Sequence, residues 1–174
     1  SIAEALGMSL TGCAVIPAPY RERSQISFET GKRIVDMVHE DLTPSKIMTK
    51  EAFENAILVA SAIGASSNCP PHLTAIARHM GLKLDIENWQ TLGHDIPLLV
   101  NCQPAGEHLM ERFHSAGGIP AIMQELLKNN KLHKNVLTVS GKTVEENLKI
   151  KIDVDTDVIK SFANPLVENA GYIV

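Results

Sequence analysis

The sequence predicts an α/β fold that is rich in helices and contains short buried strands. Apolar residues recur every three or four positions in several segments, most clearly in residues 119–127, and this spacing is typical of helices that bury one face. Two short apolar runs, 97–102 and 136–139, lie beside turns that contain proline or glycine, as buried strands often do. With 174 residues, of which 44% are apolar, the chain can form one domain around a substantial core.

Two helices are predicted before residue 40. Residues 1–6 are typical of the last turns of a helix that ends at Gly7, so we expect more chain before residue 1. Residues 28–39 form the second helix and place Ile34 and Val38 on one face.

Two more regular helical patterns occupy residues 49–81. Thr49 is a residue type that caps helix N-termini, and the helix after it extends to Gly64. The next helix ends at Gly81, a typical residue after a helix C-terminus. The apolar faces comprise Phe53, Ala56, Ile57 and Ala60 in the first helix and Leu73, Ile76, Ala77 and Met80 in the second.

The turn between these helices carries the most informative polar residues of the chain. Ser66, Ser67 and Asn68 are residue types whose side chains accept hydrogen bonds from first-turn amides, so they mark a helix start. Exposed amides and the positive end of the helix dipole also allow such a start to bind a carboxylate or phosphate. Ordinary capping explains the same residues without a ligand, and the local sequence leaves both interpretations open.

The second half of the chain contains further short elements and ends in a polar tail. Trp89 is expected in the core, and Thr143 is expected to cap the last helix. From residue 150 the chain becomes polar and turn-rich, which favours a linker, and residues 171–174 are typical of the start of a β-rich segment. The helices predicted here are 85–92, 107–114, 119–127 and 143–148.

Composition excludes several classes of protein. The 16 basic and 20 acidic residues give a net charge of −4 without a basic cluster, so nucleic-acid binding has no support. The longest apolar runs, such as 96–100, are too short to cross a membrane. Three widely spaced cysteines argue against a disulfide framework and favour a reducing compartment.

A metal site can be assembled from the sequence only by assumption. Cys69, His72 and His79 are spaced to share one side of a helix, but a fourth ligand such as His94 or Cys102 would have to come from elsewhere. A small buried thiol is the simpler interpretation of Cys69.

A series of motifs runs along the chain in a fixed order: AEALG, GKRIVDMV, AFENAI, GASSNCPPHLTAIARHMG, LGHDIPLLVNCQPAGEHL, AGGIPAI, LTVSGKTVEENL and DVIKSFANPLVENAG. This series resembles the dihydroxyacid and sugar-acid dehydratase (IlvD/Edd) family, with the strongest similarity to pentonate dehydratases that act on arabinonate or xylonate. The resemblance covers essentially the whole chain. It implies that residues 1–149 are the helix-rich part of an N-terminal α/β domain and that 150–174 are a linker and the start of a β-rich C-terminal domain.

The resemblance implies a fragment of a hydro-lyase that converts a 2,3-dihydroxy carboxylic acid to a 2-keto-3-deoxy acid. Such enzymes use an iron–sulfur cluster, 2Fe-2S or 4Fe-4S, together with Mg²⁺. The ligands of both and the catalytic serine are expected outside this chain, so Cys13, Cys69 and Cys102 are not expected to bind the cluster. A homodimer or homotetramer in the cytoplasm is expected, with a mitochondrial location as an alternative.

The family's Gly-Ser-Thr-Asn stretch and the His-Leu after it match residues 65–68 and 72–73. Ser66, Ser67, Asn68 and His72 are therefore expected to border the substrate pocket, although Ala65 and Ser67 depart from the usual glycine and threonine. The segments 94–95 and 103–106 also match family loops and are equally well explained as turns. The alternative function is a noncatalytic interaction or dimerisation module that docks through the 119–127 helix.

Overall fold

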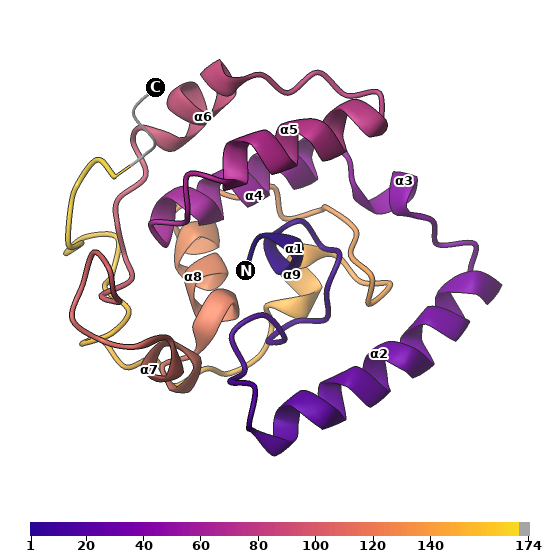
Figure 1. The fold of residues 1–174 in the computed structure, drawn as a ribbon, viewed down its shortest axis with the longest axis horizontal. Helices are drawn as coiled ribbons and strands as arrows, with labels where there is room; N and C mark the ends of the chain where they lie inside the picture. The colour runs from indigo at the N-terminus through magenta and orange to yellow at the C-terminus, as the bar shows by residue number, and fades with distance from the viewer. Residues whose placement is uncertain (171–174) are drawn as a thin grey trace.

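In the computed structural model, which describes residues 1–170, the buried helix α4 (Lys50–Ala62) is central to the fold (Figure 1). Ten of its 13 residues are buried. It contacts α1 (Ile2–Ala5), α5 (Cys69–His79), α6 (Ile86–Gly93) and α8 (Gly118–Lys128). Many of its buried positions are alanines, which allow neighbouring helices to approach closely while the few large side chains fill the space between them.

The predicted boundaries of α4 and α5 are confirmed. The hydroxyl oxygen of Thr49 accepts a hydrogen bond from the Ala52 amide at 3.4 Å, which caps the start of α4. Gly64 and Gly81 follow the two helices with φ angles of +60° and +74°, a region that glycine adopts without strain.

Helix α8 faces the core, as its spacing predicts. Ile119, Ile122 and Leu126 are each 0% exposed, and α8 contacts both α1 and α4. The alternative of a module that docks through this helix is therefore wrong, because the apolar face of α8 is already covered by the chain itself.

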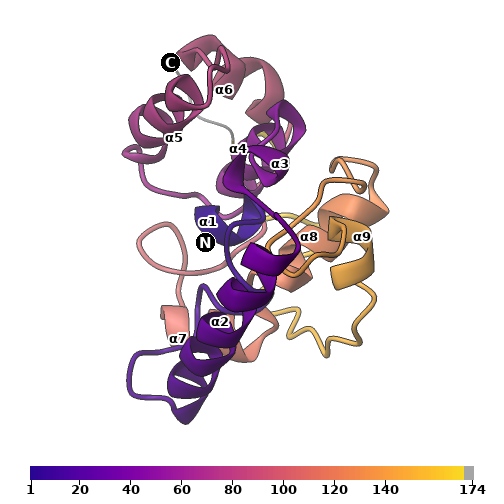
Figure 2. The same ribbon diagram turned by 90° about the vertical axis from the view of Figure 1, so that its right-hand side faces the viewer.

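Helix α2 (Arg21–His39) departs from the sequence prediction. It begins seven residues earlier than expected and buries only Met37, while Ile34 and Val38 are 55% and 73% exposed. Figures 1 and 2 show it along the outside of the molecule. Arg33 attaches it to the body, since its Nε donates to the Val139 carbonyl oxygen at 2.6 Å.

The remaining helices are short. They lie close to their predicted positions, except for the helix at 44–47, where no helix was predicted. Trp89 on α6 is 0% exposed, as expected for a core residue. Thr143 and Glu146 form a reciprocal capping box at the start of the last helix. These helices are α3 (Pro44–Ile47), α7 (Met110–Ser115) and α9 (Val144–Asn147).

The predicted strands are buried but do not form a sheet. Within residues 1–170 the only β-type pairs are four isolated bridges, so the α/β prediction is too strong for a chain that is almost entirely helical in its regular structure. The amides of Leu98, Leu99 and Asn101 donate to three separate places, the carbonyl oxygens of Val167, Ala62 and Val158. Burial of the 97–102 run was correct, but its bridges to Val167, Ile159 and His108 are single pairs that do not extend into a ladder.

The polar tail returns to the body of the protein. Val158 and Ile159 are 0% and 3% exposed within the main core, and Val167 pairs with Leu98. Whether residues 150–174 link to a further domain stays a prediction, and the expected β-rich start at 171–174 lies outside the described residues.

Glu4 fixes the loop after α1 from inside the core. Its carboxylate, in a residue only 5% exposed, accepts hydrogen bonds from the amides of Gly12 at 2.6 Å and Ala14 at 2.8 Å. Burial raises the pKa of Glu4 above its ordinary value of 4.5, against the smaller opposing effect of the two amides.

Substitution Glu4→Gln is expected to lower the free energy of unfolding by about 1–3 kcal/mol, because the glutamine NH₂ group cannot accept from the second amide. The folded state holds the Glu4 proton more tightly than the unfolded state, so the native protein gains stability as pH falls through the raised pKa towards 4.5. The variant lacks this gain, and the difference between the two proteins should widen on acidification. Urea unfolding of the full-length protein at neutral and mildly acidic pH measures it, with the exposed Glu22→Gln as control. A difference that narrows on acidification would contradict this account.

Candidate active site

The turn before α5 has a different hydrogen-bond arrangement from the predicted cap. The Ser66 hydroxyl oxygen accepts from the Asn68 amide at 3.3 Å, and the Ser66 carbonyl oxygen accepts from the Cys69 amide at 2.9 Å. Asn68 occupies the cap position in a helical conformation and its side chain makes no cap bond. The helix start is therefore organised by Ser66 rather than by Asn68.

The same arrangement removes the basis for an anion site on the first-turn amides. Pro70 and Pro71 have no amide hydrogen, and the Cys69 and His72 amides already donate to the carbonyl oxygens of Ser66 and Asn68. A carboxylate or phosphate would find no first-turn N–H directed at it, which leaves only the weaker attraction of the helix dipole. The contribution of this turn must come from side chains.

Three of the four expected pocket residues line two adjacent hollows. Ser66 lines a cavity of about 330 Å³, whereas Asn68 and His72 line an apolar groove of about 380 Å³. Ser67 is exposed and is not among the residues that line either hollow. Cys69 belongs to both linings and so lies between the two spaces.

The cavity beside Ser66 combines segments that are far apart in the sequence. Its floor is apolar, formed by Ile63, Val100 and Phe113. The turn 103–105 lines it together with Ser66, although nearly 40 residues separate the two segments. The structure thus brings the Ser-Ser-Asn turn and the Gln-Pro-Ala-Gly turn, both of which match family loops, to one space.

The two cysteines that line this cavity do not make it a metal centre. Burial raises the pKa of the Cys102 thiol, which favours the neutral form over the thiolate that metals bind. Residues 1–170 contain no group of three or more His, Cys, Asp or Glu side chains arranged to hold a metal ion. The described residues therefore do not fit an iron–sulfur cluster or a complete Mg²⁺ site, and Cys69, His72 and His79 form no such group.

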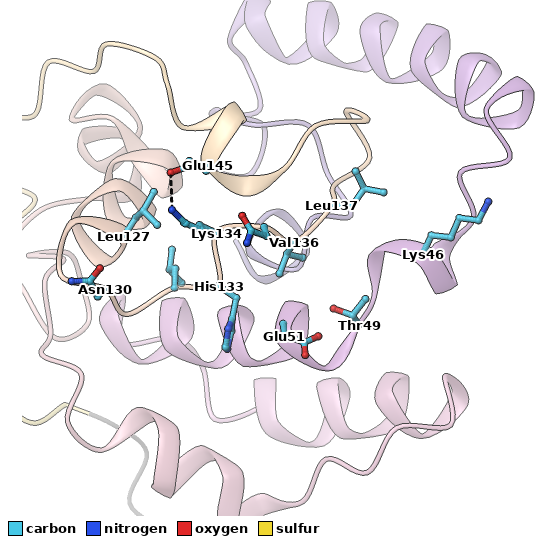
Figure 3. A pocket seen from close by; sticks show the side chains of 12 residues that line it. Lys46, Thr49, Glu51, Leu127, Asn130, His133, Lys134, Val136, Leu137 and Glu145 are labelled. Atoms are coloured by element: carbon cyan, nitrogen blue, oxygen red, sulfur yellow. Dashed lines mark hydrogen bonds and ion pairs between the residues drawn. The ribbon is translucent and has the colours of Figure 1, made fainter.

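A larger hollow of about 830 Å³ lies at the opposite end of α4, beside Thr49 and Glu51 (Figure 3). The ammonium group of Lys134 lies 3.4 Å from the carboxylate of Glu145 across its rim. His133, also in its lining, is 2.6 Å from the Glu54 carboxylate. Lys46, which also lines it, pairs with Asp41 outside the lining. None of the residues expected to border a substrate lines this hollow. We therefore take the cavity beside Ser66 as the candidate site.

No helix among residues 1–170 is long and apolar enough to cross a membrane.

Comparison with known proteins identifies the family. Residues 1–147 match the family model described as dihydroxy-acid/6-phosphogluconate dehydratase, N-terminal. The chain is 53% identical over its whole length to a D-xylonate dehydratase of Caulobacter vibrioides, of which it covers 29%. It is 46% identical over 99% of its length to an L-arabinonate dehydratase of Rhizobium leguminosarum bv. trifolii, covering 30% of that protein. A dihydroxy-acid dehydratase of Acetivibrio thermocellus is 41% identical over 99% of the chain, which covers 31% of it.

The chain thus spans less than a third of the length of these relatives, and the family match extends over most of its own length. This chain belongs to the dihydroxy-acid/6-phosphogluconate dehydratase family.

Proposed function

We propose that the full-length protein is a hydro-lyase that removes water from a 2,3-dihydroxy carboxylic acid. The proton leaves C2 and hydroxide leaves C3, and the resulting enol rearranges to a 2-keto-3-deoxy acid. The observation that carries this proposal is the 53% identity to a D-xylonate dehydratase along all 174 residues. The identity to an L-arabinonate dehydratase, 46%, also exceeds the 41% to a dihydroxy-acid dehydratase, which favours a pentonate as the substrate.

The role proposed for residues 1–174 is to form part of the substrate pocket. Ser66 supplies a hydroxyl at the cavity, with Ser67, Asn68 and His72 on the same turn and helix start. The iron–sulfur cluster and Mg²⁺ of the family would be bound by residues outside this chain, and the chemistry they supply is stabilisation of the departing hydroxide and of the charge that develops at the substrate carboxylate. A β-rich domain after residue 174, a homodimer or homotetramer and a cytoplasmic location are parts of the same proposal.

The full-length protein should dehydrate D-xylonate or L-arabinonate, and Ser66→Ala should lower kcat/KM by about 2–10-fold, because a hydrogen bond to the substrate is lost. The measurement is the rate of 2-keto acid formation. The matched control is Ser45→Ala, which removes an exposed hydroxyl in the first turn of α3, away from the residues that line the cavity. A full-length protein that forms no 2-keto acid from any 2,3-dihydroxy acid would overturn the proposed function. Equal rates for the Ser66 and Ser45 variants would overturn only the role of Ser66.

A further inference from the structure

The turn 103–106 is a fixed wall of the cavity rather than a loose surface loop. The Gln103 amide donates to the His108 carbonyl oxygen at 2.8 Å, and the Gly106 amide donates to the Cys102 carbonyl oxygen at 2.8 Å. The His108 amide in turn donates to the Asn101 carbonyl oxygen at 3.0 Å. Both ends of the turn are therefore joined by backbone hydrogen bonds, which restrict the position of the residues between them.

The buried side chain of Asn101 fixes the position of this turn. It is 6% exposed, its Oδ1 accepts from the Glu107 amide at 3.1 Å, and its Nδ2 donates to the Asp157 carbonyl oxygen at 3.3 Å. One buried amide side chain thus connects the turn to the polar tail. A buried amide with both of its polar atoms bonded is costly to displace, so the turn has a defined position.

The chemistry of the lining restricts what can enter. No Lys, Arg, His, Asp or Glu side chain is among the described residues that line this cavity. A substrate carboxylate, which needs a cation or several N–H donors, is therefore not bound by this lining. At about 330 Å³ the cavity is at the small end of ligand pockets, which suits a short uncharged chain.

Gln103 is the one side-chain amide in the lining. An amide both donates and accepts hydrogen bonds, and this combination is complementary to an alcohol hydroxyl, which does the same. The remaining floor of Ile63, Val100 and Phe113 contacts carbon atoms. Gln103 is exposed in the described chain, so its amide loses contact with water only when a bound substrate covers it. A hydroxylated carbon chain would replace the lost hydrogen bonds, whereas a branched apolar chain would not.

We infer that Gln103 selects the tail of the substrate, favouring a hydroxylated chain beyond C3 over an apolar branched one, and that Asn101 positions it. This inference rests on the proposed dehydratase function. Sites that hydrogen-bond a substrate hydroxyl discriminate against analogues that lack it, because the polar group that the substrate covers is then unpaired.

The test uses the full-length enzyme and two acids, D-xylonate and 2,3-dihydroxy-3-methylbutanoate, the second measured as a substrate or as a competitive inhibitor. Gln103→Leu should lower kcat/KM for D-xylonate by about tenfold, mainly through KM, and should leave or strengthen the interaction with the methyl-branched acid. Gln90→Leu, an exposed glutamine on α6, is the matched control and should change neither.

Asn101→Ala should shift the same preference without touching the substrate. Its matched control is Asn55→Ala, since Asn55 is equally buried and binds the His133 backbone through both atoms of its amide, at the other end of α4. Both variants should lose stability, but only Asn101→Ala should alter the preference of the enzyme for D-xylonate over the methyl-branched acid. If the Gln103→Leu enzyme is active and acts on both acids as before, or weakens equally toward both, the inference is overturned while the proposed function stands. Absence of any dehydratase activity in the unmodified protein overturns the proposed function and the inference with it.

Discussion

Replacing Phe53 with alanine is expected to lower the free energy of unfolding by about 3–5 kcal/mol. Phe53 is 1% exposed on α4, where the surrounding alanines cannot extend into the space that the ring would leave. The loss combines the transfer of the ring to water in the unfolded state with the cavity that remains in the fold. Urea unfolding of the full-length protein, followed by the circular dichroism of its helices, measures this loss.

Phe28→Ala provides the matched control. Phe28 lies on α2 and is 66% exposed, so the same change of side chain should cost less than about 0.5 kcal/mol there. If Phe53→Ala lowered the free energy of unfolding as little as Phe28→Ala, α4 would not be the centre of the core. A larger loss at Phe28 would instead show that the rest of the full-length protein covers α2.

The helical part of the fold could be predicted because its signals are local. Thr49 and Gly64 define α4 through capping chemistry and backbone conformation, and the sequence alone contains both. The outward face of α2 could not be predicted, since Ile34 and Val38 have the spacing of a buried stripe but no partner among residues 1–170 to cover them. The prediction of a sheet was wrong for a related reason. The run 97–102 is buried as expected, but its neighbours are a helix end and an irregular tail far away in the sequence.

Only the part of the candidate site that depends on local sequence signals could be predicted. Ser66 was recognisable as a helix-start residue, and the structure does place it at a cavity. Pro70 and Pro71 belong to the same sequence motif, and their lack of amide hydrogens argues against an anion site at the first turn. Ser66 and Gln103 line the same cavity because of how α4 packs against the following segments, so no local pattern could have predicted that they lie there together.

Gly106→Ala is expected to have the largest effect on activity, about a 100-fold loss of kcat/KM in the full-length enzyme. A methyl group at Gly106 would lie 2.5 Å from the carbonyl carbon and the Oδ1 of Asn101 and 2.6 Å from the Cys102 backbone nitrogen. These atoms belong mainly to the backbone and cannot rotate away, so the turn itself must move and carry Gln103 with it. A displacement of about 1 Å in a substrate-positioning segment is enough for a loss of this size.

Gly31→Ala separates this effect from a general intolerance of larger residues at glycine positions. A methyl group at Gly31, inside α2, would meet nothing within 4 Å, so the variant should keep full activity and gain up to about 1 kcal/mol of stability from its higher helix propensity. Steady-state kinetics on D-xylonate and urea unfolding of both variants measure the contrast. If Gly106→Ala retained the activity of Gly31→Ala, the turn would be free to adjust. A fixed wall at the cavity would then have no basis, because the contacts between Gly106 and Asn101 are what allow the position of this turn to influence the substrate at all.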